Sequence, residues 1–284
     1  MTKYNFYNIN KNLQIYNFFR QSKYRSLKHE NFFFAYDNLF NNFRKKKIIF
    51  VEIGVANGGS LFMWKKYFSK DSSIIGIDFN PTAKKWEKYG FKIFIGNQSD
   101  PNFWRNFFRQ IGKVDIILDD GGHTNNQMIN TFACCYKNIN DGGLILFEDV
   151  HTSYLREFGN PSKYSFINFC YSVANKINLN FFGKKFLFNY QKFVYKISFF
   201  QSIVAFYIDK KKSKRSYALD NKGIVLNAED YRLKDLKIFL FIDTFKTLLK
   251  NTISPILYSK IKKIYPFFKY FFFKVKKNEK NFFY

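Results

Sequence analysis

A glycine-rich loop between an acidic residue and an apolar helix is the first feature of this chain that could do chemistry. An apolar segment ends in Glu52, and the loop that follows carries Gly54, Gly58 and Gly59. A helix is expected to begin near Ser60. Glycines in such a turn let the backbone approach a ligand closely. The pattern therefore predicts a strand, a tight turn and a helix at a binding site.

A second carboxylate, Asp78, ends the next short apolar segment. In nucleotide-binding folds, an acid about twenty residues beyond the glycine loop accepts hydrogen bonds from the ribose hydroxyls. The loop has no GK[ST] ending, which a triphosphate site needs, and no GxGxxG spacing, which marks a dinucleotide site. S-adenosylmethionine, a nucleoside without phosphates, fits these features best.

Adjacent carboxylates end two later apolar segments, at Asp119–Asp120 and Glu148–Asp149. The carboxyl ends of parallel strands meet at one edge of a sheet, so both pairs would face the same crevice. Like charges on neighbouring strands, about 4.8 Å apart, need a counter-charge, and Mg2+ prefers carboxylate oxygens. The structural alternative for any single acid here is a helix N-cap. Two pairs together favour a metal site.

The chain has three histidines, and His123 follows the second acidic residue after a pair of glycines. An imidazole beside a metal can take a proton from a hydroxyl that the cation has made more acidic. We therefore predict His123 as the general base. His151, just after Asp149, is a weaker candidate for the same crevice, and His29 is expected to be structural or loosely substrate-facing.

Strand and helix patterns alternate along the middle of the chain, which predicts an α/β fold with a mostly parallel sheet and helices on both faces. The expected strands are 48–53, 74–78, 91–95, 114–119 and 143–148, and the expected helices are 30–43, 60–69, 82–88, 101–112, 124–137 and 163–177. Strands at 193–200 and 203–209, joined at Gln201–Ser202, would form a terminal antiparallel hairpin.

An ordered series of motifs carries a family resemblance over about residues 29–209. The series is EIGVANGGS (52–60), GIDFN (76–80), GNQSD (96–100), LDDGGH (118–123), GGLILFED (142–149) and TSY (152–154). It resembles the class I S-adenosylmethionine-dependent methyltransferases, which have a Rossmann-like fold. More narrowly, it is similar to the metal-dependent sugar O-methyltransferases of the mycinamicin type.

The resemblance implies roles for matching residues. Glu52 and the loop from Gly54 through Gly58 to Ser60 would hold the methionine moiety, and Asp78 would hold the ribose. Gln98 and Ser99 would lie near the adenine, and Asp119 would also belong to the cofactor-binding site. Asp120, Glu148 and Asp149 would ligate Mg2+, and Asp120 and His123 would be catalytic. Two residues depart from the family pattern: Asn97 stands for Asp, which would loosen the adenine site, and Gly122 stands for Ser, which would change the orientation of His123.

The composition gives weaker information about partners. The formal net charge is +26, which suggests nucleic acid, an anionic membrane or an acidic substrate. An AT-rich genome explains the same excess of Lys, Asn, Ile, Phe and Tyr without any such partner. Three cysteines, two of them adjacent at Cys134 and Cys135, predict neither a disulfide framework nor a zinc site. We expect a cytoplasmic protein without a signal peptide or a membrane-spanning segment.

The predicted organisation is an N-terminal helical extension (1–44), a methyltransferase domain (45–210) and a basic, aromatic, helical C-terminal extension (211–284). The last begins near the cationic run 210–215 and includes a helical pattern at 235–250. Its terminus, 261–277, mixes lysines with Phe and Tyr. This segment either packs on the catalytic domain or lies at the inner face of an anionic membrane.

We therefore expect Mg2+-assisted methyl transfer to a sugar hydroxyl of a surface glycan, a glycolipid or a glycosylated metabolite. A catechol-like acceptor would satisfy the same metal chemistry and stays open. A nucleic-acid-binding protein on a degenerate methyltransferase scaffold is the alternative from another class, and the intact loop and metal–base set disfavour it. A homo-oligomer is compatible with the sequence.

Overall fold

The computed structural model describes residues 13–179, 188–214, 216–224, 226, 244, 247–260 and 263. The chain divides into two compact units, Met1–Ala218 and Leu219–Tyr284. In the second unit, Thr244 and residues 247–252 are helical, and all but the last two lie within the helix expected at 235–250. The rest of that segment lies outside the described residues, as does the basic, aromatic terminus apart from Lys263. None of the helices in the described ranges is long and apolar enough to cross a bilayer.

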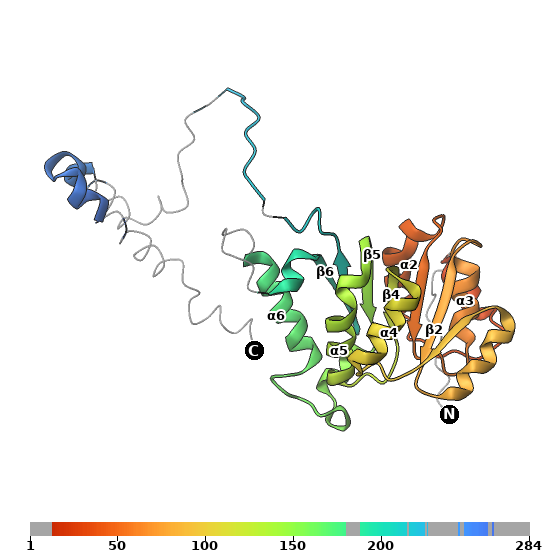
Figure 1. Cartoon of the computed structure of the whole chain (residues 1–284). Coiled ribbons are helices and arrows are strands. Elements are labelled where there is room, and N and C mark those ends of the chain that lie inside the picture. The colour runs from red at the N-terminus through yellow and green to blue at the C-terminus, as the bar shows by residue number, and fades with distance from the viewer. Residues whose placement is uncertain are drawn as a thin grey trace. The chain divides into compact units, whose positions relative to one another are not determined.

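A seven-stranded sheet forms the centre of the first unit (Figure 1). Its strands are β1 (Ile49–Ile53), β2 (Ser73–Asp78), β3 (Lys92–Ile95), β4 (Val114–Asp119), β5 (Ile139–Phe147), β6 (Val194–Phe200) and β7 (Ile203–Ile208). The order is β3-β2-β1-β4-β5-β7-β6. The first five strands are parallel, and β7 is antiparallel to both of its neighbours. The predicted Rossmann-like α/β fold with a terminal antiparallel hairpin is confirmed.

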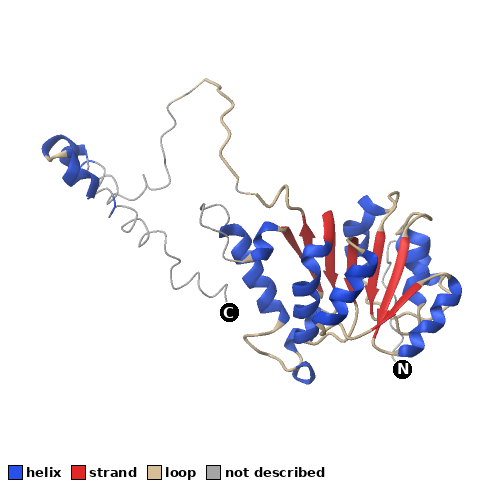
Figure 2. Cartoon of the chain, in the orientation of Figure 1, coloured by secondary structure: helices blue, strands red, loops and turns tan. Residues whose placement is uncertain are grey.

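Helices cover both faces of the sheet (Figure 2). One layer holds α1 (Gln14–Arg20), α2 (Phe32–Phe40) and α3 (Gly59–Tyr67), and the other holds α4 (Pro101–Ile111), α5 (Asn125–Cys135) and α6 (Phe166–Asn178). Side chains alternate along a strand, so Phe50 joins the core under the first layer and Val51 the core under the second. Because both faces of these strands are buried, each strand is a nearly continuous apolar run, which made the strands easy to recognise in the sequence.

Short 3-10 helices complete the first unit: η1 (Asn41–Phe43), η2 (Pro81–Tyr89), η3 (Tyr136–Asn138), η4 (Val150–Tyr154), η5 (Arg156–Phe158) and η7 (Asn189–Lys192). The helix expected at 82–88 is therefore present, as the 3-10 helix η2. Ala83 and Trp86 are its buried residues, and a 3-10 helix brings residues three apart to one side. Strand β5 begins four residues earlier than expected, at Ile139, because Ile139 already pairs with Val114; the register then shifts, and Ile116 pairs with Leu144.

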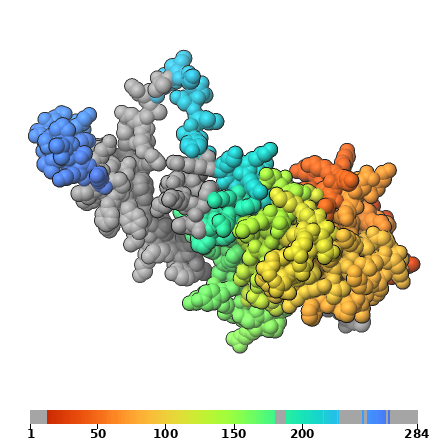
Figure 3. All heavy atoms as spheres, viewed as in Figure 1, coloured from red at the N-terminus to blue at the C-terminus, as the bar shows by residue number. Residues whose placement is uncertain are grey.

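The N-terminal segment packs within the first unit instead of standing apart from it. Ile15, Phe33 and Phe40 are buried in the same core as Phe50 of β1. In Figure 3 the atoms of this segment, in red, are continuous with the orange atoms that follow it.

The division between the units falls after Ala218, beyond the predicted boundary at residue 210. Asp209, at the end of β7, accepts hydrogen bonds from the backbone N–H groups of Lys211 and Lys212. The Ser213 hydroxyl donates to the Asp209 carbonyl. These bonds hold the start of the cationic run against the first unit.

Candidate active site

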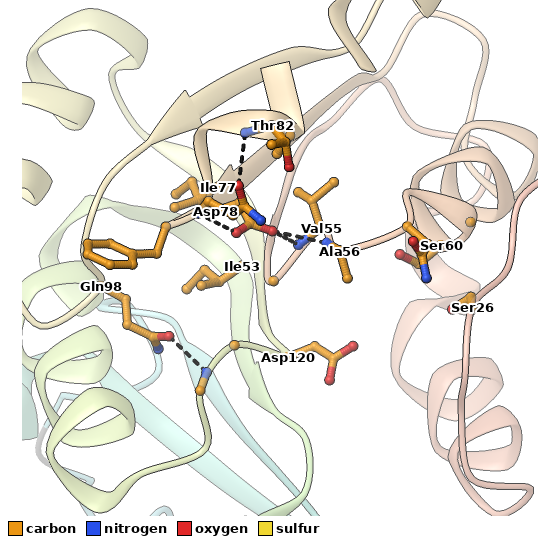
Figure 4. A pocket seen from close by; sticks show the side chains of 18 of the residues that line it. Ser26, Ile53, Val55, Ala56, Ser60, Ile77, Asp78, Thr82, Gln98 and Asp120 are labelled. Carbon is orange, nitrogen blue, oxygen red and sulfur yellow. Dashed lines mark hydrogen bonds between the residues drawn. The ribbon is translucent and has the colours of Figure 1, made fainter. Parts of the chain in front are cut away.

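A cavity of about 760 Å3 opens beyond the carboxyl ends of β1, β2 and β4 (Figure 4). Strand β1 lies between β2 and β4, so the chain crosses over in opposite directions on its two sides. Ligands of open α/β sheets bind at this point. The walls are residues 25–27, 53–57, 59–60, 77–80, 82–83, 96–98, 120–122 and 127.

The glycine loop needs its glycines. Gly54 has φ +88°, and a Cβ added there would lie 2.0 Å from the backbone oxygen of Asp120. Gly58 has φ +70° and precedes α3, and its Cβ would lie 2.5 Å from the Trp86 ring. Positive φ and close backbone approach both exclude side chains at these positions. The loop therefore packs directly against the backbone that follows β4 and against the Trp86 ring.

The Asp78 side chain holds this loop in place through hydrogen bonds. Its Oδ2 accepts hydrogen bonds from the backbone N–H groups of Val55 (2.9 Å) and Ala56 (3.0 Å), and its Oδ1 accepts from Asn80 N–H (2.8 Å). Figure 4 shows the carboxylate at the cavity wall, pointing toward Val55 and Ala56. A carboxylate offers about four lone-pair sites, so Asp78 can also accept from ribose hydroxyls.

The residues preceding α2 form another wall of the cavity. The Ser22 hydroxyl donates to the Gly59 carbonyl (2.8 Å). A Cβ at Gly59 would lie 2.3 Å from the Tyr24 carbonyl oxygen. Arg25, Ser26 and Leu27 then continue along the cavity. This backbone-to-backbone contact places the N-terminal segment directly over the start of α3.

Gln98 lines the cavity between the loops after β3 and β4. Its Nε2 donates to both carboxylate oxygens of Asp119 (3.0 and 2.9 Å), and its Oε1 accepts from Gly122 N–H (3.2 Å). Asp119 is buried behind it, and burial raises the pKa of this carboxyl while the Gln98 hydrogen bond opposes the shift. Asp119 thus orients Gln98. Ser99 does not line the cavity, and its backbone N–H donates to Asn97 Oδ1.

Glu52 is fully buried at the end of β1 and does not reach the cavity. Its carboxylate accepts from the Ser60 hydroxyl (2.9 Å) and from Trp64 Nε1 (3.0 Å), which ties β1 to α3. Burial raises the pKa of Glu52 to about 7, although the charge of Lys28 opposes the shift. Of the eight residues predicted to bind the cofactor, Gly54, Ser60, Asp78 and Gln98 line the cavity, whereas Glu52, Gly58, Ser99 and Asp119 lie behind its wall.

All three histidines of the chain surround Asp149, which follows β5. His123 Nε2 lies 3.5 Å from Asp149 Oδ2 and 3.7 Å from Asp120 Oδ1. His29 Nε2 and His151 Nδ1 each lie 3.7 Å from Asp149 Oδ1. These separations are too long for hydrogen bonds. The structure therefore brings His123, Asp120 and Asp149 together as predicted, and adds the other two histidines.

Glu148 points in another direction. Its Oε1 accepts a hydrogen bond from the Tyr36 hydroxyl, and its Oε2 lies 2.8 Å from Lys28 Nζ. Lys28 Nζ also lies 2.5 Å from Asp120 Oδ2. Burial by itself lowers the pKa of Lys28, but the charges of Asp120 and Glu148 outweigh it and raise that pKa. Burial raises the pKa of Glu148 to about 8. Neither Lys28 nor Tyr36 was predicted.

The donors at the mouth of the cavity fit a cation. Ligand atoms of Asp120, His123 and Asp149 all lie within 4.8 Å of one another. Asp149 Oδ1 and His123 Nδ1 are buried and have no hydrogen-bond partner among the described residues. Two carboxylates suit Mg2+. Glu148, predicted as a third ligand, is outside this group. His29, Asp149 and His151 form a second such group around the same aspartate.

Residues 51–150 match the family model described as "Methyltransferase domain". This region is a methyltransferase domain. A rhamnosyl tetracenomycin-C 2'-O-methyltransferase of Streptomyces olivaceus is 36% identical over 131 residues, which are 44% of this chain and 34% of the relative. The mycinamicin VI 2''-O-methyltransferase of Micromonospora griseorubida is 33% identical over 131 residues, 44% of this chain and 32% of the relative. The chain thus spans about a third of the length of these relatives.

A solved structure shares the fold of the methyltransferase domain. It is the MycE methyltransferase from the mycinamycin biosynthetic pathway in complex with Mg and SAH. Its TM-score is 0.59 at 22% identity, over 67% of this chain and 52% of that one. The predicted resemblance to class I methyltransferases of the mycinamicin type is confirmed.

Proposed function

We propose that this chain transfers the methyl group of S-adenosylmethionine to a sugar hydroxyl of a glycosylated acceptor, with Mg2+ at the acceptor site. One observation carries the proposal: Asp120 belongs both to the cavity wall and to the cation-binding group. A methyl donor in the cavity and a hydroxyl at the cation would meet there. By their names, the first relative above is a 2'-O-methyltransferase of a rhamnosyl compound and the second is a 2''-O-methyltransferase of mycinamicin VI.

The residues take distinct roles in this proposal. Asp78 accepts from the ribose hydroxyls, and Gln98, held by Asp119, lies beside the base. Asp120 and Asp149 would hold Mg2+, which when bound lowers the pKa of a hydroxyl. His123 Nε2 faces both carboxylates and accepts the hydroxyl proton. The alkoxide would take the methyl group as its bond to the sulfonium sulfur breaks, S-adenosylhomocysteine would leave, and no covalent enzyme intermediate is needed.

The acceptor is proposed as a glycosylated small molecule, a glycolipid or a surface glycan. A crevice edged by exposed His29 and His151, with half-buried Asp149 between them, suits a polar acceptor with vicinal hydroxyls. We place the reaction in the cytoplasm, and a peripheral contact with an anionic membrane through the C-terminal segment would bring the crevice to a lipid-linked sugar. This contact rests on sequence composition.

The experiment has two stages. Calorimetry first measures binding of S-adenosylhomocysteine. Methyl transfer is then measured with glycosylated acceptors, their sugar-free counterparts and a catechol, each with Mg2+ or EDTA. We expect cofactor binding in both conditions, and methylated sugar only with Mg2+. Asp149→Asn should abolish transfer and keep cofactor binding, whereas exposed Asp71→Asn should change neither. Full activity in EDTA would contradict the metal role, and methylation of the catechol alone would contradict the sugar.

A further inference from the structure

A second hollow, of about 410 Å3, opens beside the glycine loop and has no role in the reaction as proposed. Its walls are three aromatic residues, three cations and an amide: Tyr24, Arg25, Asn57, Lys85, Trp86, Lys88 and Tyr89. Of these seven, Arg25 and Asn57 also line the larger cavity, and the other five do not. None of the seven belongs to the cation-binding group of Asp120. The hollow therefore borders the candidate active site without being part of it.

Three aromatic rings pack against one another at this hollow. The Tyr24 ring centroid lies 4.7 Å from that of Trp86 and 5.6 Å from that of Tyr89. The centroids of Trp86 and Tyr89 lie 6.0 Å apart, and the hydroxyls of the two tyrosines share a hydrogen bond. Trp86 is buried beneath them. The rings thus give the hollow a well-packed and weakly polar wall.

Each of these rings has the ammonium group of the preceding residue over its face. The ammonium groups of Lys23, Lys85 and Lys88 lie 5.6, 5.0 and 5.2 Å from the centroids of the rings that follow them in sequence. Such contacts attract an exposed ammonium group to the ring and restrain it there. With Arg25, four cations therefore gather at or beside one hollow.

These four cations have no acidic partner. In the described part of the chain none of them makes an ion pair, and Glu87, on the same 3-10 helix, pairs with Lys84 instead (2.8 Å). The hydrogen bond with Tyr24 lowers the pKa of Tyr89, and the charges of the neighbouring lysines lower it further. A cleft with charges of one sign and weakly polar walls concentrates the electric field. The hollow should therefore attract anions.

We propose that this hollow binds a diphosphate group, carried either by a nucleoside or by a lipid. Four cations outnumber the charge that a single carboxylate could neutralise, whereas a diphosphate brings several negative charges and many acceptor oxygens. Lysine and arginine side chains are the usual cationic partners of phosphate oxygens. The hollow is also bounded, which suits one such group better than the extended backbone of a nucleic acid. This site goes beyond the proposed methyl transfer and does not depend on it.

The test is titration calorimetry of the full-length protein with inorganic pyrophosphate and with UDP, in EDTA, with and without S-adenosylhomocysteine. The variant K85M/K88M removes two charges and keeps apolar side chains beside the rings. Its matched control is K137M/K163M, because these exposed lysines also lie over tyrosine rings, at 5.7 and 4.9 Å. We expect K85M/K88M to bind pyrophosphate at least roughly tenfold more weakly, the contribution of one hydrogen bond to a charged group. The control should bind like the wild type, and thermal melting should show both variants folded.

Vesicles distinguish the two sources of the diphosphate. Co-sedimentation compares phosphatidylcholine vesicles that contain a polyprenyl diphosphate with vesicles that contain phosphatidylglycerol. Pelleting with the diphosphate vesicles alone, lost in K85M/K88M, would identify a lipid source. UDP binding more tightly than pyrophosphate, without such pelleting, would identify a nucleoside source.

Three results would overturn the proposal. A wild type that binds neither pyrophosphate nor UDP would do so, and so would a K85M/K88M protein that binds both like the wild type. Loss of pyrophosphate binding on saturation with S-adenosylhomocysteine would place the anion in the larger cavity instead. A protein that does not bind S-adenosylhomocysteine at all would contradict the methyltransferase function, and the pyrophosphate titrations would still decide the diphosphate site.

Discussion

Replacing Asp78 by alanine is expected to weaken cofactor binding by more than a single lost ribose contact. The carboxylate accepts hydrogen bonds from Val55, Ala56 and Asn80 at 2.8 to 3.0 Å. Hydrogen bonds to charged groups contribute about 1.5 to 3 kcal/mol each when buried, and these partly exposed bonds fall near or below the lower limit. Loss of the two loop bonds removes about 2 kcal/mol of loop order, and loss of the ribose acceptor about 1.5 kcal/mol more.

A cofactor that binds to Asp78→Ala would have to order the glycine loop, and it would lack the hydrogen bonds from its ribose to the carboxylate. A combined loss of about 3 to 4 kcal/mol corresponds to roughly 100- to 1,000-fold in Kd. Asp78→Asn keeps one acceptor oxygen for Val55 and Ala56 but loses the charge and the acceptor for Asn80. We expect it to lose about tenfold, one hydrogen bond's contribution.

Titration calorimetry with S-adenosylhomocysteine measures these affinities, and thermal melting confirms that each variant is folded. Asp71→Ala, an exposed aspartate on the loop before β2, is the matched control and should bind like the wild type. An Asp78→Ala protein that is folded and binds within about threefold of the wild type, less than one ordinary hydrogen bond, would refute the role of Asp78.

The remaining predictions concern the loop, the pH dependence, the base and the terminus. Gly54→Ala should destabilise the fold and abolish cofactor binding in melting and calorimetry. Gly112→Ala, also at positive φ but with nothing within 4 Å, should cost about 1 to 3 kcal/mol from backbone strain and leave cofactor binding unchanged; equal effects on binding would contradict the clash. The pKa of Glu52 is raised from 4.5 to about 7 in the folded protein. The protonated carboxyl therefore contributes stability that is fully present below pH 4.5 and is lost as the pH rises through 7. In urea unfolding the wild type should lose about 3 kcal/mol relative to Glu52→Gln over this range, and parallel profiles of the two proteins would contradict the shift. His123→Ala should lower kcat by roughly 100- to 10,000-fold and leave cofactor affinity unchanged, and a variant with near-normal kcat would move the base elsewhere. Full-length protein should pellet with anionic liposomes at low salt, and equal pelleting after deletion of 261–284 would rule out a membrane role for that segment.

Local patterns in the sequence were enough to predict the sheet and the cavity. Buried parallel strands are continuous apolar runs, and the side chains at their carboxyl ends must share one edge of the sheet. Gly54 and Asp78 could therefore be placed correctly relative to each other. The same reasoning placed Asp120 and Asp149 together. It needs only strand order and direction, which short connections largely determine.

Side-chain direction and distant partners could not be predicted in this way. Glu148 and Asp149 are neighbours in sequence, yet the first faces a buried lysine and the second faces the histidines. Lys28 lies 92 residues from Asp120 and 120 from Glu148, and a lysine in a polar stretch carries no local sign of burial. A buried carboxylate such as that of Glu148 does imply a counter-charge, and a search for an unplaced cation could have found Lys28.

The contacts made by residues 22–28 change what counts as an exchangeable module in this protein. The match to the methyltransferase domain begins at residue 51, but Ser22 and Tyr24 touch the start of α3 and Lys28 sits between the acidic side chains. A chimera joined at the family border would inherit the glycine loop without its opposite wall, and the carboxylates of Asp120 and Glu148 without their counter-ion. Recombination that preserves function must carry the N-terminal helices along with the sheet. The segment that must be exchanged as a whole is therefore longer than the segment that the family model matches.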